Sequence, residues 1–197
     1  MKLYDLELSG NCYRVRLLLS LLGQPVQLVN VNLGAGENRQ PWFLALNPRG
    51  QVPVLDDDGF VVWDTLAIMT YLARKAGGEK WLPSDPKNMA RVMQWLAVME
   101  NETQYGLARA RVIASMGFPG NLEEAQKIGL RVLGILEARL TAHDWLALPH
   151  CTLADIGCFP YVALARQGGL PLDDYPAILR WIARIKSLQG YVAMPGV

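Results

Sequence analysis

The sequence predicts two units of different class, an α/β unit over residues 1–78 and an all-helical unit over residues 85–197. Across the first unit the apolar residues repeat alternately with a period of two, typical of strands, and a period of about 3.6, typical of helices. Residues 77–86 then contain two glycines and two prolines, which indicates a linker. Beyond that linker the period of two nearly vanishes and helical patterns predominate.

A strand, a helix and a second strand are predicted first. In Lys2–Leu8 apolar side chains alternate with acidic ones, which predicts a strand. From Cys12 the apolar residues recur at i, i+3, i+4 and i+7, and Gly23 followed by Pro25 ends that helix. Residues 29–33 alternate again, so we expect a second strand parallel to the first, joined by a right-handed crossover.

The rest of the first unit is predicted to be a short helix, a turn and a β-hairpin, at residues 41–46, 47–50, and 52–55 with 60–63. Asp56-Asp57-Asp58-Gly59 joins the two apolar runs of the hairpin. Asp64 or Thr65 then caps a helix that ends at Gly77-Gly78. The predicted order of elements is therefore β-α-β-α-β-β-α.

Four helices are predicted in the second unit, at residues 89–116, 122–140, 152–166 and 176–188. Each carries apolar residues at helical spacing, such as Val92, Leu96 and Met99 in the first of them. Thr152-Leu153-Ala154-Asp155 matches a capping box in which aspartate takes the usual place of glutamate or glutamine. We therefore expect the third of these helices to begin there.

The composition excludes several classes of protein. Hydrophobic residues make up 51% of the 197 residues and charged residues 19%, which is not the composition of a disordered chain. The formal net charge of +1 predicts no attraction to nucleic acid or to an acidic membrane. No apolar run reaches the roughly 18 residues that span a bilayer, and acidic residues near the N-terminus are unlike a signal peptide. We therefore expect a cytoplasmic protein.

The three cysteines, Cys12, Cys151 and Cys158, are odd in number and lack a CxxC spacing. They fit neither a disulfide framework nor a zinc site. The two histidines are too few for a histidine-rich metal centre. We expect three free, buried thiols and no bound metal.

Two junctions between a strand and a helix are candidate anion sites. At Ser9-Gly10-Asn11-Cys12, free N–H groups and the positive end of the helix dipole favour a negative charge, and a serine hydroxyl there can donate to a thiolate. At Trp63-Asp64-Thr65, the N–H groups and the Thr65 hydroxyl can hold a carboxylate. At both junctions the alternative is an ordinary helix cap.

Pro53 lies inside an apolar run, where it removes a donor from the sheet. Such a proline indicates a bend or a cis bond that leaves neighbouring backbone groups available to a ligand. Because only about 5–6% of X–Pro bonds are cis, the residues alone favour trans.

These motifs, in this order, resemble the cytosolic glutathione transferases. The resemblance covers nearly the whole chain and rests on Ser9-Gly10-Asn11-Cys12, Asn47–Leu55, Asp64-Thr65 and Thr152-Leu153-Ala154-Asp155-Ile156. Its most specific part is Asn47–Leu55. Within the superfamily the chain looks like the bacterial theta-like and nu-like branches, which use serine or threonine rather than tyrosine. The resemblance implies a thioredoxin-like first domain with a glutathione site, an all-helical second domain, and an apolar acceptor site between them.

For the glutathione thiol, the resemblance implies two candidate catalytic residues. Ser9 matches the hydroxyl residue that stabilises the glutathione thiolate, and Asn11 matches a second thiol-site residue of the nu-like branch. The family often has proline or serine at the position of Asn11, so the activating group stays open between the two. Cys12 does not match the position of the catalytic cysteine in the beta or omega branches, and we interpret it mostly as a packing residue.

For the rest of glutathione, the resemblance implies five binding residues. Val52 precedes a cis-proline, Pro53, and pairs its backbone with the cysteinyl part of glutathione. Gln51 reaches the glycyl end. Asp64 and Thr65 match the acid–serine pair that holds the γ-glutamyl group, with threonine in place of the family's usual serine. Because threonine keeps the hydroxyl, we expect binding to survive.

The acidity of the thiol indicates what such a site has to supply. A free thiol has a pKa of about 8.5, and lowering that pKa by roughly two takes about 2.7 kcal/mol. One hydroxyl hydrogen bond to a charged group supplies about 1.5–3 kcal/mol, and a helix dipole adds about 0.3–1 kcal/mol. The sum is sufficient without a metal or a general base.

The resemblance places the acceptor site late on the first helix of the second unit, at Tyr105, Arg109 and Met116. The alternative is that these are ordinary core and helix-surface residues. In relatives this helix and the third helix of the first domain, near residues 66–73, form the dimer interface, so we expect a homodimer. One of the acidic residues in 100–102 could then reach the partner subunit's ligand.

The leading interpretation is a glutathione S-transferase that conjugates glutathione, its co-substrate, to small hydrophobic electrophiles. A glutathione-dependent disulfide or peroxide reductase at the same site is one alternative, which the pairing of Ser9 with Asn11 leaves open. A transferase-like binding protein without turnover is the other. The combination of Ser9, Val52-Pro53 and Asp64-Thr65 argues against the latter, because a scaffold has no need of all three.

Overall fold

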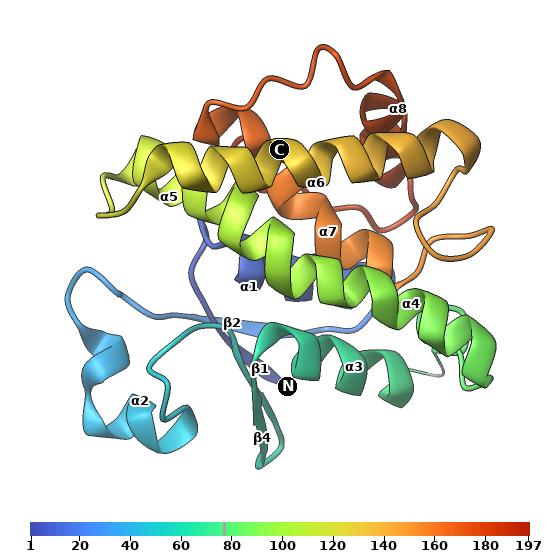
Figure 1. Ribbon diagram of the computed structural model, residues 1–197. Helices are drawn as coiled ribbons and strands as arrows, with labels where there is room; N and C mark the ends of the chain where they lie inside the picture. Colours follow the sequence, from blue (N-terminus) through green and yellow to red (C-terminus); the bar gives the residue numbers. More distant parts are fainter. Residues whose placement is uncertain (77) are drawn as a thin grey trace. The chain divides into compact units, whose positions relative to one another are not determined.

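Figure 1 shows the computed structural model of the chain, which describes residues 1–76 and 78–197. The chain forms two compact units. The first holds residues 1–76 and the tail Gln189–Pro195, and the second holds Gly78–Leu188 and Gly196–Val197. The tail is held in the first unit by the Tyr13 hydroxyl, which donates to the Val192 carbonyl at 2.7 Å. Gly77, part of the predicted helix end, lies outside the described residues.

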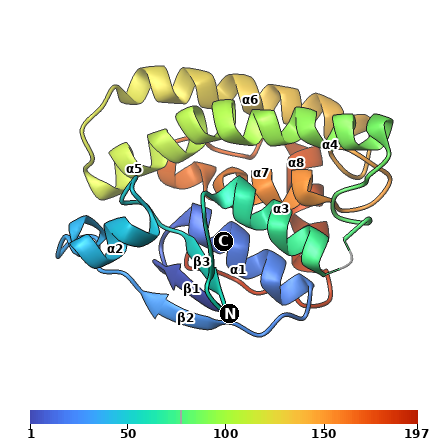
Figure 2. The same ribbon diagram turned by 90° about the horizontal axis from the view of Figure 1, so that it is seen from below.

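The first unit is a four-stranded mixed sheet with helices packed on it. Its elements are β1 (Lys2–Asp5), α1 (Gly10–Leu21), β2 (Gln27–Asn30), the 3₁₀ turn η1 (Glu37–Arg39), α2 (Pro41–Leu46), β3 (Val54–Asp57), β4 (Phe60–Trp63) and α3 (Thr65–Lys75). The strand order is β2-β1-β3-β4, in which only β1 and β2 are parallel. Helices α1 and α3 pack side by side (Figure 2). This confirms the predicted thioredoxin-like βαβαββα order.

The first strand is shorter than its periodicity predicts, and the first helix starts earlier. β1 stops at Asp5, and the Ser9 N–H then donates to the Leu6 carbonyl at 2.9 Å. That hydrogen bond turns the chain, so α1 starts at Gly10 instead of Cys12. The turn brings the first candidate motif to the start of the helix.

A small buried cluster anchors the loop between α2 and β3. Phe43 of α2 forms this cluster with Val31 and Val54, and the half-buried Val52 packs against it. The predicted hairpin follows, with β3 and β4 in register from Val54 opposite Trp63 onwards. The loop that carries the most specific sequence motif is therefore fixed at both of its ends.

The described residues of the second unit form helices and loops. Its elements are α4 (Pro86–Val98), the π-helix η2 (Met99–Ala108), α5 (Arg109–Met116), α6 (Leu122–Ala142), α7 (Leu153–Ala163), the 3₁₀ turn η3 (Ala165–Gly168) and α8 (Pro176–Lys186). All four predicted helices are present, which confirms the all-helical class of this half. No helix in the described part of the chain is both long enough and apolar enough to cross a membrane.

The first predicted helix of this unit is one helical run from Pro86 to Met116 (Figure 1), but its middle section is a π-helix. There Gly106 lies against Gly129 of α6, and a Cβ on Gly106 would sit 2.6 Å from the Gly129 nitrogen. The two helix backbones approach so closely that only glycine fits. The sequence does not predict the π-helical turns, because the spacing of its apolar residues fits a regular α-helix.

Thr152 and Asp155 form the predicted capping box at the start of α7. The Thr152 hydroxyl accepts from the Ala154 N–H at 3.3 Å, and the Asp155 carboxylate accepts from the Thr152 N–H at 2.9 Å. Asp155 is fully buried and also accepts from the Leu146 N–H and the Trp181 indole N–H, each at 3.0 Å. One carboxylate therefore ties together α7, α8 and the loop that precedes α7.

Candidate functional site

Ser9 caps α1, as the simpler interpretation of the first motif predicts. Its Oγ accepts from the Cys12 N–H at 3.3 Å, and its backbone carbonyl accepts from the Tyr13 N–H at 2.9 Å. A hydroxyl oxygen that accepts one hydrogen bond still carries a proton to donate. The cap is therefore compatible with a second role, in which the half-buried Ser9 hydroxyl donates to a bound thiolate.

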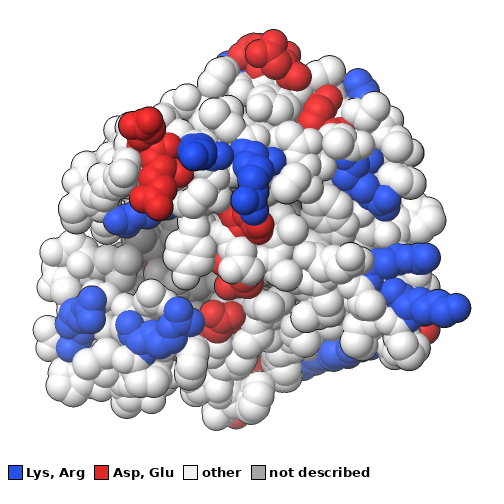
Figure 3. All heavy atoms as spheres, viewed as in Figure 1, with Lys and Arg blue, Asp and Glu red and all other residues white. Residues whose placement is uncertain are grey.

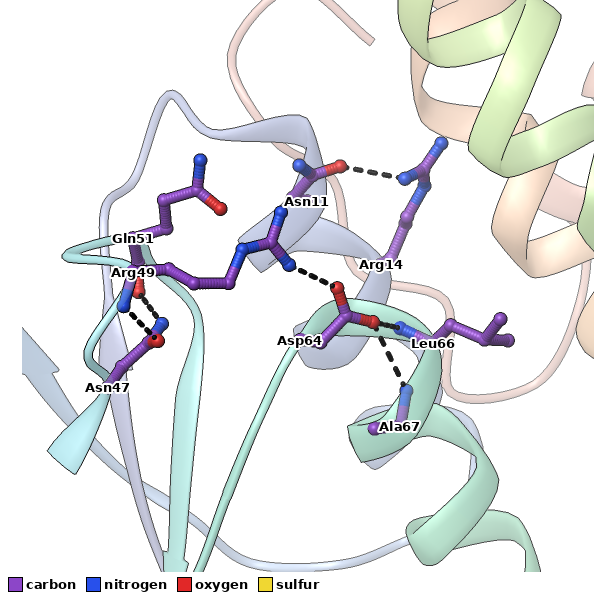
Figure 4. Close-up of polar contacts among 8 residues, drawn as sticks. All are labelled: Asn11, Arg14, Asn47, Arg49, Gln51, Asp64, Leu66 and Ala67. Carbon is purple, nitrogen blue, oxygen red and sulfur yellow. Dashed lines mark hydrogen bonds and ion pairs between the residues drawn. The ribbon is translucent and has the colours of Figure 1, made fainter.

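Asn11, in the first turn of α1, is held by Arg14 one turn further along. The Arg14 Nη1 donates to the Asn11 Oδ1 at 2.7 Å (Figure 4). Arg14 is only 1% exposed, whereas Asn11 is half-buried. The amide nitrogen of Asn11, which carries its N–H donors, points away from Arg14 (Figure 4).

Cys12 and Tyr13 have no exposed surface. Burial raises the pKa of the Cys12 thiol to about 12, although a hydrogen bond with the Ser9 side chain acts to lower this pKa. The thiol is therefore protonated at neutral pH, which agrees with the interpretation of Cys12 as a packing residue. Burial also raises the pKa of the Tyr13 hydroxyl, which faces the C-terminal tail.

Asn47 shapes the loop that carries Gln51, Val52 and Pro53. Asn47 is buried; its Nδ2 donates to the Gln51 carbonyl at 2.7 Å and its Oδ1 accepts from the Arg49 N–H at 3.0 Å. The exposed Gln51 side chain extends away from these contacts (Figure 4). The Val52–Pro53 bond is cis, as the family resemblance implied and the residues alone did not. Val52 lies outside the paired register, which starts at Val54.

Gly50 is required in the same loop. Its φ is +62°, and a Cβ there would lie 2.9 Å from the Asn38 carbonyl oxygen. The Asn38 Nδ2 donates back to the Gly50 carbonyl at 2.7 Å. Any other residue at position 50 would have to move one of these backbone segments.

Asp64 combines an unusual backbone with a carboxylate that is bonded through both of its oxygens. Its φ is +79°, a region that few residues other than glycine adopt, and such strained residues cluster at active sites. Its Oδ1 accepts from the N–H groups of Leu66 and Ala67 at 3.0 and 3.5 Å, and its Oδ2 pairs with the Arg49 guanidinium at 3.1 Å (Figure 4). Arg49 also lies 6.0 Å from the centre of the Trp63 ring.

The start of α3 offers fewer N–H groups than the sequence suggested. The sequence suggested that the N–H groups there could hold a ligand carboxylate. The Asp64 carboxylate takes those of Leu66 and Ala67, however, and the Ile68 N–H bonds to the Asp64 carbonyl. Among the described residues, this leaves the backbone N–H of Thr65, beside its own hydroxyl, for a ligand carboxylate. The Thr65 residue as a whole is 6% exposed.

The three acceptor-site candidates lie along one helical segment of the second unit. Tyr105 of η2 is 64% exposed, and Met116, at the end of α5, is 39% exposed. Arg109 starts α5, and its guanidinium donates to the Pro119 carbonyl, so it also holds the following loop. The spacings of four and seven residues between them place these side chains near one face of the segment. Glu102, considered for a contact across a dimer, pairs within the chain with an arginine of α6.

Sequence reasoning missed Arg14, Arg49 and the role of Asn47. Each acts through hydrogen bonds to residues that were predicted, namely Asn11, Asp64 and Gln51. A signal was available, because Asn47 and Arg49 lie inside one of the four motifs on which the resemblance rests, and Arg14 lies two residues after another. A positive charge beside a candidate anion site merits the same attention as the hydroxyl and amide groups in it.

The remaining cysteines and the surface charges add no second reactive centre among the described residues. Cys151 and Cys158 are buried and are not joined in a disulfide, as predicted. The described residues contain no group of three or more metal-ligating side chains. Basic and acidic side chains are interspersed on the face in Figure 3, in keeping with the net charge of +1.

Comparisons with known proteins cover both halves of the chain. Residues 3–80 match the family model described as glutathione S-transferase, N-terminal domain. Residues 119–184 match the model described as glutathione S-transferase, C-terminal domain.

Curated proteins and solved structures agree with these matches. The chain is 32% identical to Glutathione S-transferase D7 of Anopheles gambiae, over 96% of this chain and 88% of that one. It is 36% identical to Maleylacetoacetate isomerase of Pseudomonas aeruginosa, over 91% of this chain and 88% of that one. A crystal structure of glutathione S-transferase from Pseudomonas fluorescens superimposes with a TM-score of 0.92 at 34% identity, covering 98% of both chains.

Proposed function

This chain is a glutathione transferase of the cytosolic glutathione S-transferase superfamily, and on that premise we propose that it conjugates the glutathione thiolate to small hydrophobic electrophiles by means of Ser9 and Asn11. The observation that carries the proposal is the start of α1, where a hydroxyl and an amide with free donor capacity stand beside a helix N-terminus. We assign the chain to the Ser-type, theta-like or nu-like branch for the same reason.

The reaction needs the thiol of glutathione as its anion. The Ser9 O–H and the Asn11 N–H donate to the sulfur, and the dipole of α1 adds to them. Together these interactions lower the pKa of the bound thiol below neutral pH, and its proton passes to solvent. The sulfur lone pair then attacks the electrophilic carbon, a carbon–sulfur bond forms, and the leaving group departs with its bonding electrons.

Five residues of the first domain, for which we propose the bounds 1–78, bind the remainder of glutathione. Thr65 donates its N–H and hydroxyl to the α-carboxylate of the γ-glutamyl group, and Asp64 accepts from the ammonium of the same group. The backbone of Val52 pairs with the cysteinyl part, next to the cis bond to Pro53, while Gln51 reaches the glycyl end. The ion pair from Arg49 to Asp64, which joins the loop to α3, supports this assignment.

The second domain, for which we propose the bounds 85–197, supplies the acceptor side through Tyr105, Arg109 and Met116. The exposure of Tyr105 and Met116 supports this role, because an apolar electrophile needs apolar surface to contact. Apart from glutathione and the electrophile, we propose no further cofactor, no metal, and neither nucleic acid nor membrane as a partner. We place the protein in the cytoplasm.

We also propose a homodimer that associates through α3 and α4. Helix α4 buries Val92 and Leu96 within the chain but leaves Met93 44% exposed. This exposed apolar side chain favours contact with a second copy of the chain. Sedimentation at micromolar concentration should show a species of about twice the 21.9 kDa chain mass. A species of the single-chain mass would contradict the proposed dimer.

Two activity assays test the proposed reaction. We expect turnover of a chloronitrobenzene acceptor with glutathione, and slower reduction of a small glutathione disulfide. The reductase is a second candidate because Asn11 adds a second donor to the thiol site, so the faster of the two reactions identifies the main activity. Binding of glutathione without either turnover would instead indicate a transferase-like binding protein.

A further inference from the structure

Arg14 is a buried cation that contacts one specific atom of the thiol site. Its Nη1 donates to the Asn11 Oδ1 at 2.7 Å within the first turns of α1 (Figure 4), and its residue exposure is 1%. Burying a guanidinium is costly unless its contacts compensate. A residue that served only to cover apolar surface at this position would not need a charge.

The contact determines the orientation of the Asn11 amide. The two ends of an asparagine amide are nearly equal in size, so packing alone selects neither orientation. A guanidinium has donors and no acceptor, so it bonds only to the oxygen end. Arg14 therefore holds Oδ1 on its own side and directs the two N–H donors of Nδ2 away from itself, as Figure 4 shows.

We propose that Arg14 is a positioning residue of the thiol site, which fixes the Asn11 amide so that its N–H groups, and never its oxygen, face the glutathione thiolate. This inference rests on the proposed role of Asn11. With the amide reversed, a partial negative charge would face the thiolate and oppose its formation. The charged donor on Oδ1 also polarises the amide, which strengthens the hydrogen bond from Nδ2 to the sulfur.

Arg16 provides a matched control on the same helix. Its guanidinium pairs with Asp5 and donates to the carbonyls of Leu6 and Glu7, and none of these contacts involves Asn11. Removing Arg16 takes away the same charge from the same helix and disturbs the fold near the same turn. An effect on the thiol that Arg14 produces and Arg16 does not is therefore an effect on the amide.

The test measures the pKa of the enzyme-bound glutathione thiol from the ultraviolet absorbance of the thiolate. We expect Arg14→Met to raise this pKa by about one, with roughly threefold less kcat/KM at pH 7 because the thiolate fraction falls by that factor, and little change in glutathione affinity. Asn11→Ala should raise it similarly, and the double variant should show no larger rise than Asn11→Ala alone. Arg14→Lys keeps a cationic donor, so the pKa of the bound thiol should rise less in this variant than in Arg14→Met. Arg16→Met should leave the pKa unchanged.

Additive rises of the thiol pKa in the double variant, or a folded Arg14→Met protein with the wild-type pKa, would overturn the inference.

A second measurement needs no change at Arg14. The side-chain amide protons of Asn11, identified by NMR through their absence in Asn11→Ala, should shift with the titration of the bound thiol, and amide protons that ignore this titration would also overturn it. If the wild-type protein does not lower the pKa of the bound glutathione thiol, the proposed function itself is refuted. If the wild type lowers this pKa and Arg14→Met lowers it equally, only the inference about Arg14 is refuted.

Discussion

Substituting Ser9 by alanine removes two interactions of one hydroxyl group, and each has its own measurable consequence. The Ser9 oxygen accepts from the Cys12 N–H at 3.3 Å, which caps α1. The hydroxyl proton remains available, and we propose that it is donated to the glutathione thiolate. The first interaction stabilises the fold with or without ligand, while the second acts only on the charged form of the bound thiol.

The magnitudes separate the two roles. Loss of a serine cap costs about 1 kcal/mol, which lowers the melting temperature of a chain of this length by about 2–4 °C. Loss of a hydrogen bond to a charged group costs about 1.5–3 kcal/mol, which raises the pKa of the bound thiol by roughly one to two. Turnover at neutral pH should then fall about tenfold or more, with a smaller change in glutathione affinity.

The assay is the pH dependence of kcat, measured beside thermal melts for three variants. Ser9→Thr keeps cap and donor and should resemble the wild type. Ser9→Asp keeps a capping acceptor but has no proton to donate at neutral pH, so it should melt normally and turn over slowly. A Ser9→Ala protein that melts lower yet keeps the wild-type pH profile would refute the reasoning and leave Asn11 as the activating group.

Three further substitutions test other parts of the account. Cys12→Ala should leave conjugation within a few-fold of wild type, because burial raises the pKa of this thiol to about 12, and a mixed disulfide of Cys12 with glutathione in mass spectra would contradict this. Thr65→Ala should raise the KM for glutathione roughly tenfold with nearly unchanged kcat, since its contacts are equal in the ground and transition states. If the variant still gains the wild-type thermal shift from glutathione, Thr65 is only a structural residue. Asp155→Ala should lose on the order of 3 kcal/mol of stability, because the buried N–H groups of Leu146 and Trp181 lose their acceptor. A melting temperature within 2–4 °C of wild type, equivalent to about 1 kcal/mol, would argue that water or another group replaces that carboxylate.

Local patterns were enough to predict the order of elements and several of their boundaries. Asp64 and Thr152 cap α3 and α7 where the sequence placed caps, because a cap depends only on residues within one turn. The end of β1 at Asp5 was not predicted, since it depends on the hydrogen bond from Ser9 to Leu6. The π-helical turns of η2 were missed because the apolar spacing matched an ordinary helix.

The candidate site shows the same division between local and tertiary information. The motifs identify Ser9 and Asp64 as candidate site residues, but they do not show which partners the hydroxyl and the carboxylate already bond. The number of free N–H groups on α3 was overestimated because the Asp64 carboxylate folds back on them. The contacts of Arg14 with Asn11 and of Arg49 with Asp64 depend on the three-dimensional position of the side chains, which the motifs do not specify.

The most direct test of the account is a calorimetric titration of the protein with glutathione at neutral pH, repeated in buffers of different ionisation enthalpy. If the first domain holds glutathione as its thiolate, binding releases a proton from the thiol, and the observed heat depends on the buffer. S-methyl glutathione, which has no thiol proton, should bind with no such dependence. We predict that glutathione binds to the wild type with release of a proton. In the variant lacking both Ser9 and Asn11, this proton release should be lost. Absence of binding, or binding whose heat is the same in every buffer, would contradict the account.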